Sequence, residues 1–430
     1  MKIYPASSLT GTIDLRGDKS ISHRAALIAA MAVGDTRIEN FSTAEDCQTT
    51  IKCLRELGVS ISQYGTDVAV KGVGKTGFRK AEKPLDCGNS GTTMRLLSGI
   101  LAGQDFESVL CGDESLQKRP MQRIVDPLEK MGARIATNHG KPPLTISGKH
   151  LLRSIDYSQV TPSAQIKSCI LLAALNADGE TVVVESIKTR DHTERMLEWF
   201  DAGIKIGKSE DQTSITVQGN SEITARDFAV PSDISSAAFF MIAAACLDGS
   251  DITLPAVGIN PTRTGILDLL CRIGVDAGIL GAADACNEPV GTIRVRGGLR
   301  PQIDSVTIDG PLIAGMIDEL PIVAILGTQL DKGIEIRDAA ELRVKETDRI
   351  TVIVENLKRM GADITELEDG FKVKRSQLKG AVVDSFGDHR IAMAFAVAGL
   401  LAEGETEIIG AECANISFPG FFNVLDHVVR

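Results

Sequence analysis

A pattern of about 72 residues recurs six times along this chain of 430 residues. Each copy has a polar cluster, an alanine-rich apolar stretch, a glycine and a run of β-branched residues. An apolar stretch closed by glycine predicts the end of a helix, and the β-branched run predicts a strand. The closing glycines are Gly34, Gly103, Gly179, Gly249, Gly333 and Gly404.

A second helix-to-strand junction recurs between these copies with the same spacing, as in "LRELGVSI" (54–61) and "LKRMGADI" (357–364). Two independent landmarks with one period predict six α/β units, each with two helices and short strands. A chain of this length exceeds one ordinary core, so we expect two domains of three units each. The glycines of this second junction are Gly58, Gly132, Gly203, Gly274 and Gly361.

Composition excludes several classes of protein. The net charge of -11 argues against broad binding to nucleic acids or anionic membranes. The nine cysteines include no CxxC pair, so neither a zinc site nor a disulfide framework is predicted. The start "MKIYPASSLTG" has no apolar stretch of signal-peptide length, and no apolar run approaches the length of a membrane span. We therefore expect a soluble, cytoplasmic protein without a metal.

The polar cluster at the start of each apolar helix predicts an anion site, because helix N-termini offer unpaired N–H groups. Repetition should point these ends toward a common cleft. Lys345 and Arg349 are four residues apart, which predicts one face of a helix. So many cations favour a ligand with several negative charges, such as phosphate or carboxylate groups. The clustered residues are Lys19, Ser20, Arg24, Lys118, Arg119, Lys345, Arg349 and Arg390.

Three acids lie among these cations: Asp233, Asp318 and Glu346. Either aspartate could be a helix N-cap, and Glu346 could be half of an ion pair. Carboxylates among cations in a dry cleft can also work as a general acid/base pair. The residues alone thus indicate a phosphate-rich small ligand, with Asp318 and Glu346 as candidate acids.

Two further motifs invite other interpretations. "GVGKTG" (72–77) resembles a P-loop fragment, but Ala69 stands where the first glycine is needed and no helix is expected after it. His192 could be a metal ligand. Asp191 with Glu194 three residues later instead favours a capping box that opens a helix.

Ten motifs, in order over nearly the whole chain, resemble those of the 5-enolpyruvylshikimate-3-phosphate synthase family, in particular the second of its two sequence classes. The resemblance implies an α+β fold, an inside-out α/β barrel in which each of two domains has three ββαβαββ-like units in pseudo-threefold arrangement. It implies domains of 16–228 and of 1–15 plus 229–430, with the active site in the cleft between them. The motifs are "DKSISHR", "GNSGTTMRLL", "GDESLQKRPM", "SAQIKS", "TRDHTERM", "SDISSAAFF", "NPTRTG", "RVKETDRI", "DHRIAMA" and "SFPGFF".

The resemblance also implies a reaction, in which the enolpyruvyl group of phosphoenolpyruvate passes to the 5-hydroxyl of shikimate 3-phosphate and phosphate is released. It implies no cofactor or metal, and we expect a monomer with small-molecule substrates only. Carried over by matching motif, the catalytic residues are Asp318, Glu346 and Lys19. Shikimate 3-phosphate would contact Lys19, Ser20, Arg24, Ser163, Gln165, Arg190, Asp318 and Lys345. Phosphoenolpyruvate would contact Lys19, Gly91, Arg119, Gln165, Arg349 and Arg390.

Two positions qualify the resemblance. Some relatives carry a lysine where this chain has Ile416, so one cation is absent or replaced from elsewhere. Gly91 leaves room for glyphosate, a phosphoenolpyruvate mimic, so inhibition is expected. One alternative is the enolpyruvyl transferase that acts on UDP-N-acetylglucosamine, whose loop cysteine is missing from "DESLQKRP". The other is a binding module without catalysis.

Overall fold

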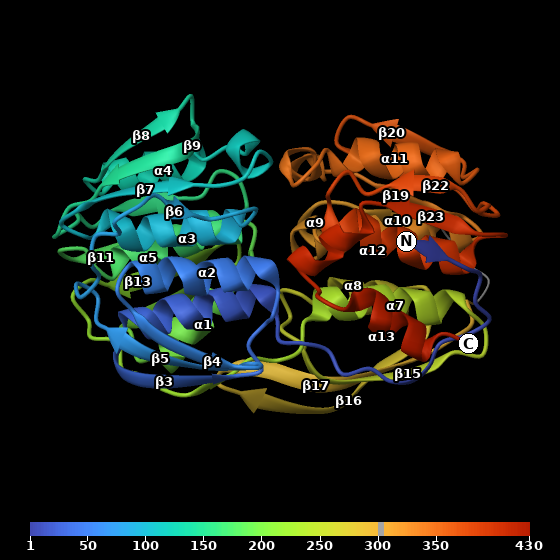
Figure 1. Cartoon of the computed structure of the whole chain (residues 1–430), viewed down its shortest axis with the longest axis horizontal. Helices are drawn as coiled ribbons and strands as arrows, with labels where there is room; N and C mark the ends of the chain where they lie inside the picture. Colours follow the sequence, from blue (N-terminus) through green and yellow to red (C-terminus); the bar gives the residue numbers. More distant parts are fainter. Residues whose placement is uncertain (300–304) are drawn as a thin grey trace. The chain divides into compact units, whose positions relative to one another are not determined.

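The computed structural model describes residues 1–299 and 305–430, which form two compact units (Figure 1). The N-terminal unit comprises Gly17–Val230 and Asp284–Glu288. The C-terminal unit comprises Met1–Arg16, Pro231–Ala283 and Pro289–Arg430. The sequence-based division into 16–228 and 1–15 plus 229–430 differs from these units at Arg16, at residues 229–230 and at the segment Asp284–Glu288.

Six small sheets correspond to the six predicted units. In each four-stranded sheet, an edge strand pairs parallel with its neighbour, which pairs antiparallel with the next strand. The sixth sheet has three strands, because the short N-terminal strand β1 (Lys2–Ile3) takes the antiparallel position beside β23 (Thr406–Ile409). The shared strand order confirms the predicted repeats and the mixed α/β fold.

The sheets of each unit follow in strand order. In the N-terminal unit, the first sheet has the order β14 (Phe228–Ala229), β3 (Val33–Glu39), β5 (Asp67–Val73), β4 (Ser60–Tyr64). The second has the order β6 (Leu85–Asp86), β7 (Glu107–Cys111), β9 (Lys141–Ser147), β8 (Arg134–Asn138). The third has the order β10 (Asp156–Ser158), β11 (Glu180–Glu185), β13 (Thr213–Gln218), β12 (Ile204–Lys208). In the C-terminal unit, the first sheet has the order β16 (Asp276–Ala285), β17 (Glu288–Arg296), β15 (Asp251–Gly258), β2 (Thr10–Thr12). The second has the order β18 (Val306–Ile308), β19 (Ile334–Ile336), β21 (Gly370–Val373), β20 (Ile364–Leu367). The three-stranded sheet has the order β1, β23, β22 (Val382–Asp384).

Alanine-rich helices fill the middle of the N-terminal unit, between its sheets (Figure 1). Small side chains let α3 and α5 pack closely, since a Cβ on Gly99 would lie 2.2 Å from the Cys169 carbonyl oxygen. The helices of this unit are α1 (Lys19–Met31), α2 (Glu45–Glu56), α3 (Gly91–Ala102), the 3₁₀ helix η1 (Leu116–Lys118), α4 (Gln122–Lys130), α5 (Ala164–Ala174) and α6 (His192–Trp199).

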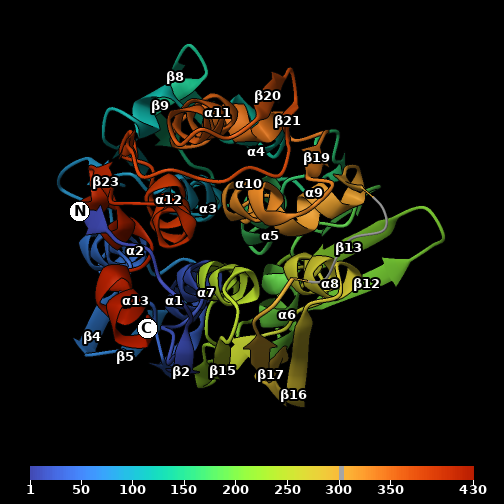
Figure 2. The ribbon, with the colours of Figure 1, turned by 90° about the vertical axis from the view of Figure 1, so that its right-hand side faces the viewer.

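The C-terminal unit repeats this plan, with α7, α10 and α12 in the middle and α8, α11 and α13 around them (Figure 2). The helices are α7 (Ile234–Cys246), α8 (Gly265–Arg272), α9 (Pro311–Met316), α10 (Leu320–Gln329), η2 (Ala340–Val344), α11 (Arg349–Arg359), α12 (His389–Leu401), η3 (Ala411–Ile416) and α13 (Phe421–Val428).

Glycines of both sets end helices, as Gly103 does for α3, but Gly34 is an exception. Gly58 and Gly361 follow the ends of α2 and α11 with φ of 89° and 83°, a left-handed conformation that ends helices and favours glycine. Gly34 does not end α1. That helix stops at Met31, because Ala32 is already extended and the chain passes directly into β3. The prediction of a helix-ending glycine was wrong at this position.

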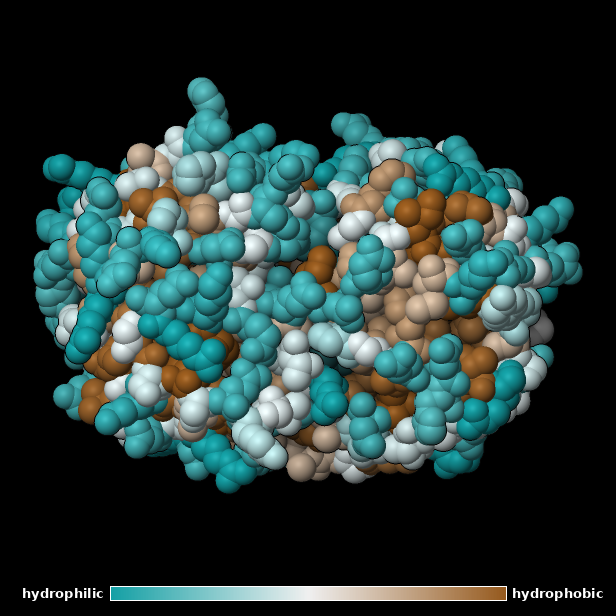
Figure 3. Space-filling model, in the orientation of Figure 1, coloured by the Kyte–Doolittle hydropathy of each residue, from teal (hydrophilic) through white to brown (hydrophobic). Residues whose placement is uncertain are grey.

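Several large apolar residues are exposed on the surface of the described residues. Figure 3 shows a largely hydrophilic face, with hydrophobic residues gathered over parts of both units. Val382 and Ile409, on β22 and β23, are exposed apolar residues of the C-terminal unit. In the described ranges, no helix is long and apolar enough to cross a membrane.

Candidate active site

The N-terminal turns of the inner helices carry the polar clusters seen in the sequence. Asp18 caps α1 by accepting a hydrogen bond from the Ile21 N–H at 2.8 Å. Ser90 caps α3, and Ser163 caps α5, each through its hydroxyl oxygen. These short polar side chains begin helices because they pair donors that would otherwise lack partners.

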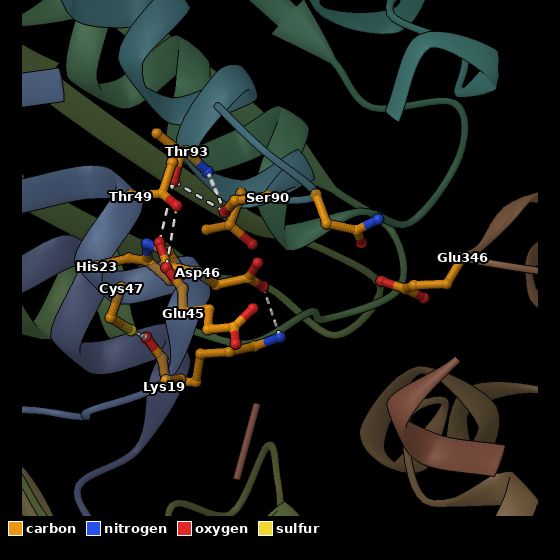
Figure 4. A network of polar contacts seen from close by, with 12 residues as sticks. Lys19, His23, Glu45, Asp46, Cys47, Thr49, Ser90, Thr93 and Glu346 are labelled. Atoms are coloured by element: carbon orange, nitrogen blue, oxygen red, sulfur yellow. Dashed lines mark hydrogen bonds and ion pairs between the residues drawn. The ribbon is translucent and has the colours of Figure 1, made fainter. Parts of the chain in front are cut away.

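Lys19 lies in the first turn of α1 and points toward a carboxylate of α2 (Figure 4). Its Nζ is 2.9 Å from Asp46 Oδ2, and both side chains are largely buried. One turn further along α1, His23 Nδ1 is 2.6 Å from Thr50 Oγ1. Burial, together with the charges of Lys19 and Arg24, lowers the pKa of His23 well below its usual value. The charge in this turn therefore belongs to Lys19, and His23 is neutral.

Arg24 joins the second turn of α1 to α5 and α6. Its Nε donates to Thr193 Oγ1 at 2.7 Å, and its Nη2 donates to Ser168 Oγ at 2.8 Å. Its Nη1 donates to the Ser20 carbonyl at 2.8 Å, which places the other predicted residue of this turn beside it. The guanidinium is almost completely buried, so its orientation is fixed by protein contacts.

Gly91 is the first residue of α3 and lies beneath two guanidinium groups. A Cβ at this position would lie 2.7 Å from Arg95 Nη1 and 3.2 Å from Arg119 Nη1. Arg119 Nη2 donates to Asn89 Oδ1 at 2.7 Å. Glycine here therefore lets two arginines approach the backbone at the start of a helix, which suits an anion.

Gln165 completes this cluster from the first turn of α5. Its Oε1 accepts from Arg95 Nη1 at 2.7 Å, and its Nε2 donates to Thr92 Oγ1 at 2.9 Å. The predicted residues of α3 and α5 are thus brought together. Arg190 lies two residues before α6, half-buried, in the segment that leads to Thr193.

In the C-terminal unit, Asp318 lies between α9 and α10 with two cations beside it. Its Oδ1 is 3.5 Å from Lys345 Nζ and 3.6 Å from Arg349 Nη1. The structure therefore brings together three of the residues predicted in this unit. A carboxyl group held among cations is a candidate general acid or base.

Arg349 gathers the acidic side chains of this site around a buried guanidinium. Its Nη2 is 2.6 Å from Glu346 Oε2, and its Nε and Nη2 donate to the two oxygens of Asp388 at 2.7 and 3.2 Å. Burial alone would lower its pKa, but the carboxylates of Asp388 and Glu346 outweigh burial, and the pKa of Arg349 is raised. Arg349 is therefore a fixed positive charge that orients Glu346.

Arg390 is the second residue of α12, in its first turn. Asp388 caps this helix by accepting from the Arg390 N–H at 2.9 Å. The Arg390 Nη1 lies 3.8 Å from Glu319 Oε1, and both side chains are buried. The last predicted cation is thus held at a helix N-terminus, beside a carboxylate that follows Asp318 in the chain.

Two local predictions were wrong. Lys345 and Arg349 do not share one helix face, because Asp348 caps a new helix by accepting from the Thr351 N–H, and Lys345 lies before it in an extended conformation. The capping box of α6 does not form either. The Asp191 carboxylate binds Lys188 and Arg195. The Glu194 carboxylate is buried and binds Lys167.

The sequence analysis missed several partners of the predicted residues. Asp388 and Asp46 hold Arg349 and Lys19, and Arg95 holds Gln165. Asp388 opens the motif "DHRIAMA" directly before an apolar helix, so an N-cap could have been predicted there. Its ion pair with Arg349 joins residues 39 positions apart in the chain, which no local pattern indicates.

Among the described residues, no group of three His, Cys, Asp or Glu side chains could hold a metal ion.

Comparison with known structures identifies the class of fold. One similar solved structure, the enolpyruvyl transferase NikO from Streptomyces tendae, is 17% identical, with a TM-score of 0.79 over 99% of this chain and 96% of that one. This likeness shows the fold of an enolpyruvyl transferase.

The family follows from closer matches. The family model of EPSP synthase (3-phosphoshikimate 1-carboxyvinyltransferase) matches residues 3–425. A 3-phosphoshikimate 1-carboxyvinyltransferase from Solibacter usitatus (strain Ellin6076) is 48% identical over 431 residues, covering 100% of this chain and 99% of the relative. The solved EPSP synthase from Acinetobacter baumannii is 41% identical, with a TM-score of 0.86 over 100% of this chain and 98% of that one. The chain belongs to the EPSP synthase family.

Proposed function

We propose that this protein transfers the enolpyruvyl group of phosphoenolpyruvate to the 5-hydroxyl of shikimate 3-phosphate. The observation that carries this function is the pairing of two acids with buried cations in one unit and a helix-end cluster of cations in the other. Asp318 contacts Lys345 and Arg349, and Glu346 contacts Arg349. Both substrates carry a phosphate and a carboxylate, and the carboxylate of phosphoenolpyruvate is attached to its reacting carbon, so cations are needed to hold them side by side.

Each substrate takes its proposed contacts from both clusters. We propose that Lys19, Ser20, Arg24, Ser163, Gln165, Arg190, Asp318 and Lys345 bind shikimate 3-phosphate. We propose that Lys19, Gly91, Arg119, Gln165, Arg349 and Arg390 bind phosphoenolpyruvate. The shared residues Lys19 and Gln165 would then lie where the two substrates meet. Arg95, which fixes Gln165, supports that position.

The reaction has two balanced steps. In the first, the 5-hydroxyl loses its proton to a base and its oxygen bonds to C2 of phosphoenolpyruvate, while the methylene carbon gains a proton from an acid. In the second, the bond from C2 to the phosphate oxygen breaks, phosphate leaves, and a methyl proton returns to a base. Asp318 and Glu346, with Lys19, supply these proton transfers. General acid–base groups of this kind typically contribute about 10²–10⁴ in rate.

The protein works, in this proposal, as a cytoplasmic monomer. All of the proposed substrate contacts come from one chain. The described residues include nine free cysteines, among them the buried Cys47 and Cys169. Cysteines without disulfides are typical of proteins in a reducing compartment.

Release of phosphate from phosphoenolpyruvate tests the function, with shikimate 3-phosphate or UDP-N-acetylglucosamine as acceptor. We expect release only with shikimate 3-phosphate, and a fall in kcat of about 10²–10⁴ in Asp318→Asn. Release with the nucleotide sugar would assign the protein to the other transferase. Tight binding of shikimate 3-phosphate without release from either acceptor would leave a binding module. An Asp318→Asn variant with the wild-type rate would remove Asp318 from the chemistry.

A further inference from the structure

The N-terminal unit contains a buried ion cluster outside the predicted substrate contacts. Lys167 lies in the second turn of α5, and its side chain has no exposed surface. Its Nζ is 2.8 Å from Glu185 Oε2 and 2.6 Å from Glu194 Oε1, and both carboxylates are also buried. We call Lys167, Glu185 and Glu194 the ion cluster.

The ion cluster fixes both ends of a short segment of chain. Glu185 is the last residue of β11, and Glu194 lies in the first turn of α6. Glu185 also accepts hydrogen bonds from the backbone N–H and the hydroxyl of Thr189. Between the two carboxylates runs the segment 186–193, which includes Arg190. One ammonium group on α5 therefore holds the entry and the exit of the segment that carries a proposed substrate contact.

The neighbours of Lys167 and Glu194 hold a second proposed contact. Ser168 and Thr193 directly follow and precede these residues in the chain, and their hydroxyl oxygens are 2.7 Å apart. Arg24 donates to both hydroxyls, at 2.8 and 2.7 Å. The contact of Lys167 with Glu194 thus sets the spacing of α5 and α6 at the place where both helices bind Arg24.

The composition of the ion cluster argues against a purely stabilising role. Two carboxyl groups share one ammonium out of water, so the acidic groups of the cluster outnumber its basic group. Burial raises the pKa of Glu194, although the nearby Lys167 acts against this shift. The Glu194 Oε2 has no hydrogen-bond partner within the described part of the chain. Apolar residues of similar volume commonly stabilise a fold as well as a buried ion pair or better, so a fixed geometry is the more telling property of such a group.

We propose that the ion cluster is a positioning device for the phosphorylated acceptor: Lys167, through Glu194, holds Arg24 and Arg190 where they bind shikimate 3-phosphate. The inference rests on the proposed function and deepens it, because Lys167 acts on affinity without touching either substrate. The proposed phosphoenolpyruvate contacts Gly91 and Arg119 belong to a different network, built on Asn89 and Arg95. Loss of the ion cluster should therefore weaken the binding of shikimate 3-phosphate and not that of phosphoenolpyruvate.

The test removes the link to α6 and leaves a neutral pair behind. In Glu194→Ala, Lys167 keeps Glu185 as its counterion, so the variant retains a balanced buried charge. We expect the Kd of shikimate 3-phosphate alone, measured by titration calorimetry, to rise at least tenfold. At saturating acceptor, kcat and the KM of phosphoenolpyruvate should stay within threefold of the wild type. Lys167→Met should show the same split between affinity and rate, and Glu194→Ala decides alone if that variant does not fold.

A matched control uses the other end of the same helix. Lys75 Nζ donates to the carbonyl of Leu175, the C-cap residue of α5, at 2.9 Å. Lys75→Met therefore removes a lysine tether from α5 far from Arg24, and its Kd should stay within twofold of the wild type. A Kd unchanged in Glu194→Ala, or a kcat that falls as far as the affinity, would overturn the inference. Wild-type protein that neither binds shikimate 3-phosphate nor releases phosphate would instead refute the proposed function.

Discussion

Replacing Gly91 with alanine probes how the first turn of α3 contributes to binding. The new Cβ would lie 2.7 Å from Arg95 Nη1, a distance that real Cβ contacts essentially never show, and 3.2 Å from Arg119 Nη1. Arg95 must therefore move, and its hydrogen bond to Gln165 Oε1, now 2.7 Å, is lengthened or lost. A hydrogen bond to a charged group contributes about 1.5–3 kcal/mol, which corresponds to about 10- to 100-fold in affinity.

The backbone should tolerate this change. Gly91 is the first residue of α3 and does not have a positive φ, so alanine is not strained there. Alanine is also the better helix former, by about 0.5–1 kcal/mol in a helix interior. We therefore expect Gly91→Ala to raise the KM of phosphoenolpyruvate about 10- to 100-fold while the Tm stays at or slightly above the wild-type value.

A second glycine on the same helix gives the opposite result. A Cβ on Gly99 would lie 2.2 Å from the Cys169 carbonyl oxygen, which is backbone and cannot turn aside. Overpacking of this kind costs about 1–3 kcal/mol, so Gly99→Ala should lower the Tm by several degrees. Phosphate-release kinetics and calorimetry on both variants separate binding from stability. A KM of phosphoenolpyruvate within twofold of wild type in Gly91→Ala would refute the assignment of Gly91 and its arginines to that substrate.

Two further predictions concern the herbicide and pH. Because Gly91 leaves room beside Arg119, glyphosate at millimolar concentration should inhibit in competition with phosphoenolpyruvate, and full activity at that concentration would count against this expectation. The folded-state pKa of His23 lies well below 6.5, so the unfolded chain takes up a proton first as the pH falls, and stability is lost below pH 6.5. Calorimetry between pH 7 and 5 should show a shallower fall of Tm in His23→Gln than in the wild type; parallel curves would contradict the assignment to His23.

The repeat architecture could be predicted because its signals are local. Helix caps such as Asp18 and Ser90, and helix-ending glycines such as Gly58, act within a few residues of their own position. All six copies of the repeat predict the same α/β unit, so a helix end that is misplaced in one copy does not change the predicted fold. Gly34 shows the limit, since there α1 passes into β3 without a glycine at its end.

The partners of the site residues could not be predicted in the same way. Spacing placed Lys345 and Arg349 on one helix, but the side chain of Asp348 starts a new helix between them. Both cations still reach Asp318, so these three side chains lie together for a tertiary reason and not a local one. Glu194 likewise fits a capping pattern, yet a buried lysine competes for it more strongly than a backbone N–H. A carboxylate has several possible partners, and only the packed structure decides among them.

The net charge of -11 sets a further condition on how two anionic substrates are held. The overall field of such a chain does not attract anions, so recognition depends on short-range contacts. Arg349 meets this condition, since its guanidinium is buried and already oriented by Asp388 and Glu346. Lys19 is oriented by Asp46 in the same manner. Charges fixed in advance need no reorganisation when the substrate arrives, which is the property that makes electrostatic stabilisation effective in catalysis. In the proposed mechanism, the carboxylates that neutralise these cations therefore weaken their long-range attraction and, by fixing their geometry, prepare them for the reaction.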